Sequence, residues 1–400
     1  MVGMMESAGK QKKIVIVVEN LPCPFDRRVW QEAKTLREAG YQVSIICPMG
    51  EGYGETFEII DDIYIYRHPL WYEANGILGY LLEYSSALFW EFILLWRVYL
   101  TRGFDIVHAC NPPDLIFLPG GFFKLLGKKF VFDHHDINPE LFEAKFGKRG
   151  LLYRLALLLE RLTFYVADIS IATNNSYKGI AIDRGRMKPD RVFVVRSGPN
   201  MERLKLMPPK KSLRNGKRFL VGYVGVMGKQ EGIDHLLRSV QYITHVLRRQ
   251  DVQFYLVGGG TELDSLREYA NKLKVSDYVF FSGRLSEQEL LEVLNTADLC
   301  VNPDVANEMN DKSTMNKILE YMALGKPIVQ FDLKEGRVSA RGASLYAKKN
   351  DEVDFALKII QLLDNEELRI KMGSFGRKRI IDELEWSYEA PKLLEAYSTV

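Results

Sequence analysis

The chain has 400 residues, of which 47% are hydrophobic and 26% are charged, and its formal net charge is +2. This length exceeds one ordinary core and favours two domains, while the balanced charge argues against general nucleic-acid binding. The four cysteines are scattered and form no C-x-x-C pair, which is typical of reduced thiols in a cytoplasmic protein.

Short apolar strands alternate with helices in the first half of the chain. The stretch "KKIVIVVEN" (12–20) predicts a strand, residues 27–40 a helix, and residues 41–48 a second strand. Further strands are expected at 104–110, 128–136, 167–174 and 190–200. This alternation predicts parallel βαβ units.

The same pattern restarts after a proline-rich and charged stretch at 206–217, which we interpret as a linker. Strands, two of them ending in glycine loops, are expected within 219–232, 252–260, 278–286 and 298–304. We therefore predict two doubly wound Rossmann-like domains, 1–205 and 218–385, that face a central cleft. The last residues, 386–400, are expected to form a helix that packs back toward the first domain.

Two segments of the first half are unusually rich in leucine and aromatic residues. The first, 76–100, carries Glu83, Glu91 and Arg97, and these three charges argue against a membrane-spanning helix. It is either a buried core helix or a helix that lies in a bilayer surface with Phe89, Trp90, Phe92 and Trp96 partly exposed. The second, 145–167, sets a leucine-rich run beside Lys145, Lys148, Arg149 and Arg154, which supports the membrane-surface alternative.

The stretch "NDKSTMNKILEYMALGKPIVQF" (310–331) predicts one amphipathic helix followed by a buried strand. Asp311, Ser313 and Thr314 offer N-cap chemistry, and Gly325 ends the helix. The backbone N–H groups and the positive dipole end near Ser313 could hold a phosphate, and Glu320 on the same face could accept the hydroxyls of a ribose. The polar face therefore suits a nucleoside-diphosphate ligand, and a plain solvated face is the alternative.

Glycine loops follow two strands of the second half, at 222–232 and 256–262. Glycine lets the backbone approach a phosphate or sugar closely. Neither loop matches G-x-G-x-x-G or the phosphate loop G-x-x-x-x-G-K-[ST], so each is a weak signal by itself.

The run "DHHD" (133–136) resembles a metal site at first sight. Adjacent residues of a strand point to opposite faces, so His134 and His135 cannot easily share one ion, and we expect no metal. His134 is expected to be structural, and so is His108.

The motifs of the second half, in their order, resemble the C-terminal domain of the retaining GT-B glycosyltransferases of family 4, also called glycosyl transferases group 1. They are "VGYVGVMGKQEGIDHLL", "VQFYLVGGGTELDSL", "VFFSGRLSEQEL", "ADLCVNP" and "NDKSTMNKILEYMALGKPIV". The resemblance extends over nearly the whole chain through "KIVIVVENLPCPFDRRVWQEAKTLREAGYQVSIICP", "HACNPPD" and "FVFDHHDINPEL". It implies a GT-B fold with an acceptor-binding first domain and a nucleotide-sugar-binding second domain.

The resemblance also implies a role for individual residues. Glu320 matches the second glutamate of the family's E-x7-E signature and would bind the donor ribose, and His135 matches a histidine at the reaction centre. The residues implied in donor binding are Gly225, Gly228, Arg284, Leu285, Ser313, Thr314, Met315 and Glu320. Asn20, Arg27 and Arg28 would line the acceptor side of the cleft, and no metal is implied.

Several positions depart from the family pattern, among them the N-terminal loop, where "LPCPFDRR" (21–28) replaces the family's glycine pair. Lys312 stands where the first glutamate of the signature is expected, and Val226 and Glu231 stand where the family has an arginine and a lysine. We therefore predict that Lys229, between those two, is the cation that faces the phosphates, with Arg27 or Arg28 as the alternatives. The departures suit an altered donor-sugar geometry better than an inactive enzyme, because Glu320 is retained.

The function expected from the resemblance is transfer of a hexosyl or N-acetylhexosaminyl group, with retention, from a nucleotide-diphosphate sugar. The donor is expected to be a UDP-sugar used as substrate, with no further cofactor. The acceptor would be lipid-linked or a growing cell-surface polysaccharide or glycolipid, at the inner face of the cytoplasmic membrane. A sugar-nucleotide epimerase of the same architecture and a non-catalytic nucleotide-sugar-binding protein are the alternatives.

Overall fold

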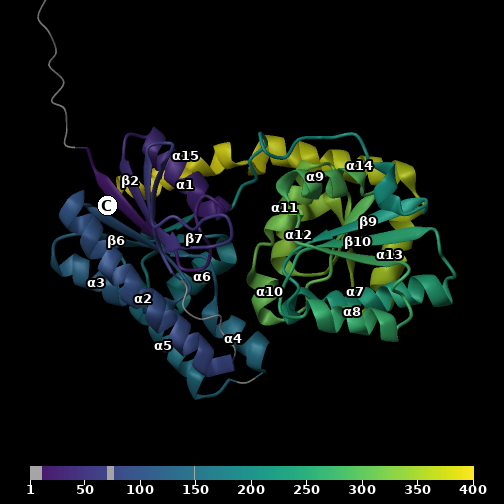
Figure 1. The fold of residues 1–400 in the computed structure, drawn as a ribbon, viewed down its shortest axis with the longest axis horizontal. Helices are drawn as coiled ribbons and strands as arrows, with labels where there is room; N and C mark the ends of the chain where they lie inside the picture. The colour runs from purple at the N-terminus through teal and green to yellow at the C-terminus, as the bar shows by residue number, and fades with distance from the viewer. Residues whose placement is uncertain (1–10, 70–75, 148) are drawn as a thin grey trace, which may run out of the picture. The chain divides into compact units, whose positions relative to one another are not determined.

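The computed structural model describes residues 11–69, 76–147 and 149–400 (Figure 1). The chain divides into two compact units. Unit 1 comprises Met1–Glu143, Gly147–Arg196 and Glu389–Val400, and unit 2 comprises Ser197–Tyr388 with Ala144–Phe146. Each unit contains one sheet, and each is described by itself below.

The sheet of unit 1 has eight strands in the order β3-β4-β2-β1-β5-β6-β7-β8. The strands are β1 (Lys13–Val17), β2 (Gln42–Pro48), β3 (Phe57–Ile60), β4 (Ile63–His68), β5 (Ile106–Cys110), β6 (Lys129–His134), β7 (Ile169–Ala172) and β8 (Val192–Val194). The helices are α1 (Arg27–Glu38), α2 (Gly76–Thr101), α3 (Phe117–Leu125), α4 (Asn138–Phe146), α5 (Leu151–Val166), α6 (Asn175–Asp183) and α15 (Trp386–Ser398). All strand pairs are parallel except β3 with β4.

The antiparallel hairpin β3–β4 is absent from the sequence prediction. Its two turn residues, Asp61 and Asp62, both have a positive φ, as a tight two-residue hairpin turn requires. The hairpin extends the sheet at its edge beyond the predicted parallel units.

Unit 2 has six parallel strands in the order β11-β10-β9-β12-β13-β14. They are β9 (Phe219–Val224), β10 (Val252–Val257), β11 (Val279–Gly283), β12 (Leu299–Asn302), β13 (Ile328–Phe331) and β14 (Ser344–Ala347). The helices are α7 (Ile233–Gln241), α8 (Leu263–Lys272), α9 (Glu287–Thr296), α10 (Glu308–Lys312), α11 (Asn316–Ala323), α12 (Lys334–Ala340), α13 (Glu352–Leu363) and α14 (Glu366–Arg379). Short 3₁₀ or π turns of the chain span Asp114–Ile116, Pro189–Arg191, Lys211–Arg214, Lys229–Glu231, Tyr242–Val246, Arg341–Ala343 and Ile380–Leu384.

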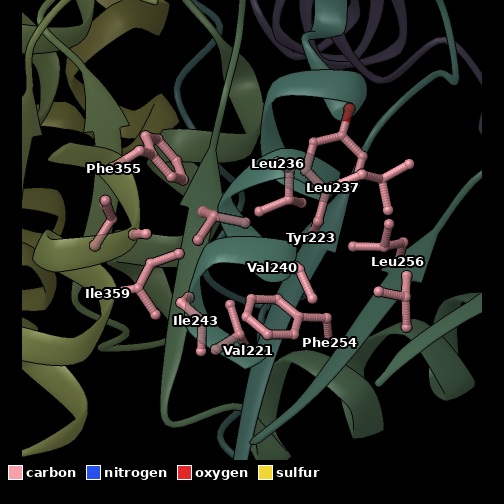
Figure 2. Close-up of a cluster of buried hydrophobic side chains, with 14 of the residues drawn as sticks. Val221, Tyr223, Leu236, Leu237, Val240, Ile243, Phe254, Leu256, Phe355 and Ile359 are labelled. Carbon is pink, nitrogen blue, oxygen red and sulfur yellow. The ribbon is translucent and has the colours of Figure 1, made fainter. Parts of the chain in front are cut away.

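The core of unit 2 shows why this sequence forms a doubly wound sheet. Alternate strand residues point to opposite faces, so Val221 and Tyr223 of β9 meet α7 and α13 on one face (Figure 2). Leu220 of the same strand lies in a second buried cluster with residues of α9 and α11. Both faces of the sheet are therefore covered, as the apolar strands predict.

The start of unit 2 lies earlier in the chain than the sequence suggests. The predicted linker began at residue 206, but unit 2 starts at Ser197. Leu204 is buried in the second cluster of unit 2, and Met201, Met207 and Leu213 pack against it. Apolar side chains within a charged, proline-rich stretch are thus part of the second core.

The two leucine-rich segments both form helices of unit 1, α2 and α5. In α2, Leu94, Leu95 and Val98 are buried, whereas Phe89 is 58% exposed. Trp90, Phe92 and Trp96 are half-buried. Lys148 of the second segment lies outside the described residues. Among the helices that the structure describes, none is long and apolar enough to cross a membrane.

Candidate functional site

The carboxyl ends of β9, β10, β11 and β12 form the edge of unit 2 where the predicted donor residues gather. The strand order reverses between β9 and β12, because β10 lies on one side of β9 and β12 on the other. Open α/β sheets bind ligands beyond the carboxyl ends of their strands at such a reversal. The residues at this edge are therefore the first candidates for a ligand site.

The two glycine loops at this edge pack directly against each other. The Gly225 N–H donates to the Val257 carbonyl over 3.1 Å, and the Met227 N–H donates to the Gly259 carbonyl over 2.9 Å. Gly258 has φ +138°, and a Cβ there would clash with the carbonyl oxygen of Gly225. These close backbone contacts explain why glycine occupies the loop position Gly258. They also place the two loop backbones together at the edge of the sheet.

The predicted single helix from residue 313 is wrong in detail, because the chain forms two helices here. Asn307 caps α10, and the Ser313 hydroxyl donates to the Met309 carbonyl over 2.8 Å. Ser313 and Met315 are extended, and α11 begins at Asn316. Local bonds of this kind compete with a continuous helix. Ser313, Thr314 and Met315 are thus the segment that leads into α11.

Glu320 lies on α11 and is only 9% exposed. Its carboxylate forms an ion pair with Arg203, whose guanidinium also lies 3.2 Å from Glu287. Sequence reasoning missed Arg203, since 117 residues separate it from Glu320 and no spacing signal links them. The pair holds the Glu320 carboxylate in place instead of leaving it in bulk solvent.

A second charged cluster joins the glycine loop to α11. The Lys317 ammonium forms an ion pair with Glu231 and lies 2.8 Å from Asp304, which follows β12. The Tyr223 hydroxyl donates to the same Glu231 carboxylate over 2.8 Å. Burial and the Glu231 charge raise the pKa of Asp304 to about 7 against the opposing effect of Lys317. A lysine of α11 therefore stands beside the position where the family lysine is replaced by Glu231.

The remaining predicted donor residues lie around these loops. Lys229 is exposed in the 3₁₀ turn Lys229–Glu231, beside Gly228. Arg284 is exposed, and its side chain passes within 3.6 Å of the point where a Cβ on Gly259 would lie. Leu285 is half-buried against the second core cluster. Gly225, Gly228, Lys229, Arg284, Leu285 and Glu320 are thus carried by neighbouring segments of one sheet edge.

In unit 1, the predicted residues His135 and Arg28 meet on Asp133. Arg28 donates to both carboxylate oxygens of Asp133, over 3.1 and 2.9 Å, and to the Val195 carbonyl over 2.9 Å. The His135 Nε2 lies 2.6 Å from Asp133 Oδ2. Burial acts to raise the pKa of Asp133, but Arg28 and His135 outweigh it and hold that pKa well below its usual range. Asp133 is therefore an ionised acceptor that orients the His135 ring, which is 14% exposed.

Arg28 differs from its predicted place in an open acceptor loop. Its side chain is 7% exposed and also pairs with the buried Glu32 over 3.1 Å. The neighbouring predicted residues Asn20 and Arg27 are exposed. Arg28 thus belongs to the buried support of His135, whereas Asn20 and Arg27 lie on the surface of unit 1.

The histidines of "DHHD" point to different surroundings, as the strand argument requires. His134 is buried among the rings of Phe164 and Tyr177, and burial with the nearby Arg184 lowers its pKa to about 3. Another grouping with metal-ligand chemistry within the described residues is His108, Cys110 and Asp133. Arg28 already donates hydrogen bonds to both carboxylate oxygens of Asp133, and burial raises the pKa of the Cys110 thiol. This chemistry does not suit a divalent cation.

Comparison with known proteins places the chain in a family. Residues 218–365 match the family described as glycosyl transferases group 1, and residues 26–203 match glycosyltransferase family 4. The chain belongs to the family 4 glycosyltransferases. Its residues in the E-x7-E region and at the first glycine loop are therefore variants within that family.

Relatives and solved structures support this family membership and its fold. The glycosyltransferase CapM of capsular polysaccharide biosynthesis in Staphylococcus aureus is 24% identical over 63% of this chain and 67% of its own. Alpha-maltose-1-phosphate synthase of Mycolicibacterium smegmatis is 25% identical over 69% and 74%. Sucrose-phosphate synthase of Thermosynechococcus elongatus superposes with a TM-score of 0.75 at 17% identity, covering 97% of this chain and 98% of its own. The fold of this family 4 glycosyltransferase is thus GT-B, with two Rossmann-like domains.

Proposed function

We propose that this glycosyltransferase transfers a sugar, with retention of configuration, from a UDP-sugar to a lipid-linked or growing cell-surface acceptor. The proposal rests chiefly on one observation. Glu320, the two glycine loops and the start of α11 lie together at the sheet reversal of unit 2. The Anabaena protein HepE, which has a TM-score of 0.73 to this chain at 15% identity and covers 97% of this chain and 100% of its own, has been solved with UDP-glucose bound and supports a uridine donor.

The proposed chemistry needs a stabilised leaving group more than a nucleophilic residue. When the bond from the anomeric carbon to the diphosphate breaks, negative charge grows on the diphosphate and the sugar becomes oxocarbenium-like. Backbone N–H groups at the start of α11, with Lys229 as the cation, would stabilise the departing diphosphate. The departing phosphate oxygen would accept the proton of the acceptor hydroxyl, which attacks from the same side. We propose that no metal is required for this step.

His135 is proposed to approach the donor sugar, held by Asp133 and Arg28. The His135 Nε2 lies 2.6 Å from Asp133 Oδ2 and 3.0 Å from Arg28 Nε. These two contacts hold Nε2, so the other ring nitrogen would face the reacting sugar. The cleft between the two domains stays a prediction, and this role depends on it.

Incubation of the purified chain with labelled UDP- and GDP-sugars and a membrane lipid extract tests the activity. Glycosyl transfer to lipid supports the proposal. Release of a free epimer would point to an epimerase instead, and nucleotide binding without turnover would point to a binding protein.

The ribose assignment has a sharper test in Glu320→Ala. Loss of hydrogen bonds to a charged acceptor costs roughly 1.5–3 kcal/mol, so UDP affinity should fall by about 10- to 100-fold in calorimetric titration. Glu287→Ala is the matched control, because it also removes a carboxylate partner of Arg203 but is not expected to touch the ribose. Equal UDP affinity in Glu320→Ala and the unaltered chain would remove the assignment.

A further inference from the structure

Three helices of unit 1 expose large apolar side chains in regular stripes. The exposed residues recur at i, i+4 and i+7 or equivalent helical positions, so each set lies along one side of its helix. They are Phe89, Ile93 and Leu100 of α2, Leu118, Phe122 and Leu125 of α3, and Leu151, Leu155, Leu158 and Tyr165 of α5. We call these ten residues the apolar face. Leu125, Leu151 and Tyr165 are more than 80% exposed, so this face is not covered by the described chain.

The three helices lie side by side, which makes the apolar face continuous (Figure 1). Phe92 and Trp96 of α2 contact the Phe122 ring of α3, with centroids 5.3 and 5.6 Å apart. Lys124 of α3 donates to the Val166 carbonyl at the end of α5 over 2.7 Å. A contiguous exposed apolar surface of this kind marks an interaction site, because water-exposed apolar area of that extent is unfavourable.

The exposed charged side chains that the structure describes beside the apolar face, on the same three helices, are all basic. Arg97 of α2 and Arg154 and Arg161 of α5 are exposed within the same stripes. Two acidic residues of these helices, Glu91 and Glu160, are buried, and within the parts of the three helices whose side chains are described no acidic side chain is exposed. The surface therefore combines leucine and aromatic side chains with positive charge only.

We propose that the apolar face docks onto a bilayer surface that carries anionic headgroups. Its leucine and aromatic side chains would enter the boundary of the acyl chains, and Arg97, Arg154 and Arg161 would lie against headgroup phosphates. This inference rests on the membrane-linked acceptor proposed above, and it names the surface that meets the membrane. The charges argue against a second copy as the occupant, because a two-fold interface would pair this patch with itself and bring arginines together with no acidic partner.

Sedimentation of the full chain with lipid vesicles tests the docking surface. The chain should bind vesicles of phosphatidylcholine and phosphatidylglycerol and bind pure phosphatidylcholine weakly. Arg154→Gln with Arg161→Gln should lower binding to the mixed vesicles roughly 25-fold, since each arginine near an anionic surface contributes about fivefold. Leu155→Ser with Leu158→Ser should lower binding to both kinds of vesicle.

Leu357→Ser with Ile370→Ser provides the matched control, because these exposed apolar residues belong to unit 2. This control should bind vesicles like the unaltered chain. Absence of vesicle binding by the unaltered chain, or equal binding by all variants, would overturn the proposal. A dimer in light scattering that the α5 variants dissociate would overturn it in favour of self-association.

Nucleotide affinity, measured on the same variants without vesicles, separates this inference from the proposed activity. UDP binding should be unchanged in the α5 variants. If the unaltered chain transfers sugar to an extracted acceptor but binds no vesicles, the docking inference fails while the proposed function stands. If the unaltered chain binds vesicles through the apolar face but transfers no sugar, the docking inference stands while the proposed function fails.

Discussion

Single buried ionisable residues decide much of the chemistry of this chain. Glu231 replaces a lysine that the family resemblance would place beside the phosphates, and Lys317 of α11 pairs with it from 86 positions further along the chain. If Glu231 is removed, the mostly buried Lys317 ammonium keeps Asp304 as its carboxylate partner, and if Lys317 is removed, two neighbouring carboxylates lose their shared cation. The two residues therefore have to be interpreted together, and Glu231 alone is not a sign of lost function.

Glu91 is a buried carboxyl in α2 whose titration makes a measurable prediction. Burial raises its pKa from 4.5 to about 8. The folded state thus holds the proton more tightly than the unfolded state, so this residue's effect on stability is favourable below pH 4.5 and is lost as the pH rises toward 8. Glu91→Gln should remove that loss of stability, which amounts to roughly 5 kcal/mol between pH 4.5 and pH 8.

Urea unfolding of both proteins at pH 5 and pH 9 measures this difference. The variant should be about as stable as the unaltered chain at pH 5 and clearly more stable at pH 9. The same pH dependence in both proteins would show that Glu91 is not the group that titrates.

At the scale of elements, local backbone conformation and short-range contacts determine the loops and the helix start at the point where the strand order of the second sheet reverses. The α10–α11 break lies at the extended residues Ser313 and Met315, where the Ser313 hydroxyl bonds to the Met309 carbonyl. The loop after β10 can lie against the loop after β9 because its glycines lack a Cβ. These features bring Gly225 and Gly258 into backbone contact, and they set the position that the proposed diphosphate would occupy.

Gly258→Ala tests whether this loop packing supports the donor site. The new Cβ would meet the Gly225 carbonyl in a backbone conformation that alanine rarely adopts, so we expect a loss of about 1–3 kcal/mol in unfolding free energy. UDP affinity should fall as well, because the loops must separate. Gly259→Ala is the control, since its nearest neighbours are Arg284 side-chain atoms at 3.6 Å. Equal stability in thermal unfolding and equal UDP affinity in titration for Gly258→Ala and Gly259→Ala would show that the loop packing does not support the donor site.

At the scale of the whole molecule, the chain leaves unit 1, forms unit 2 and returns to complete unit 1. The returning residues Glu389–Val400 bury Leu393, Ala396 and Tyr397 in unit 1. The Tyr397 hydroxyl lies 2.5 Å from His108 Nδ1, and Glu389 accepts from the Arg196 N–H over 2.9 Å. The stability of unit 1 therefore depends on the contacts that its last helix makes with the earlier residues of the unit.

A chain that ends at Tyr388 should therefore lose stability in unit 1 and keep it in unit 2. Removal of three buried apolar side chains and a buried hydrogen bond costs several kcal/mol, roughly 4–8 in total. Limited proteolysis with mass spectrometry should show early cleavage within 11–196 and protection of 197–388. A chain that ends at Ser398 serves as the control. Equal protection of both units in the shorter chain would contradict this account.

The amino-acid sequence alone determined the alternation of strands and helices, the glycine loops and the family, and it singled out Glu320 as a candidate ribose ligand. These features depend on residues that are near one another in the chain, where periodicity and loop chemistry act directly. The pairs Arg203–Glu320, Lys317–Glu231 and Arg28–Asp133, the β3–β4 hairpin and the start of unit 2 at Ser197 were decided only in the folded chain. The three pairs form because folding brings together side chains that local patterns do not connect, and the unit boundary follows the second core, which collects apolar residues from both sides of a polar stretch.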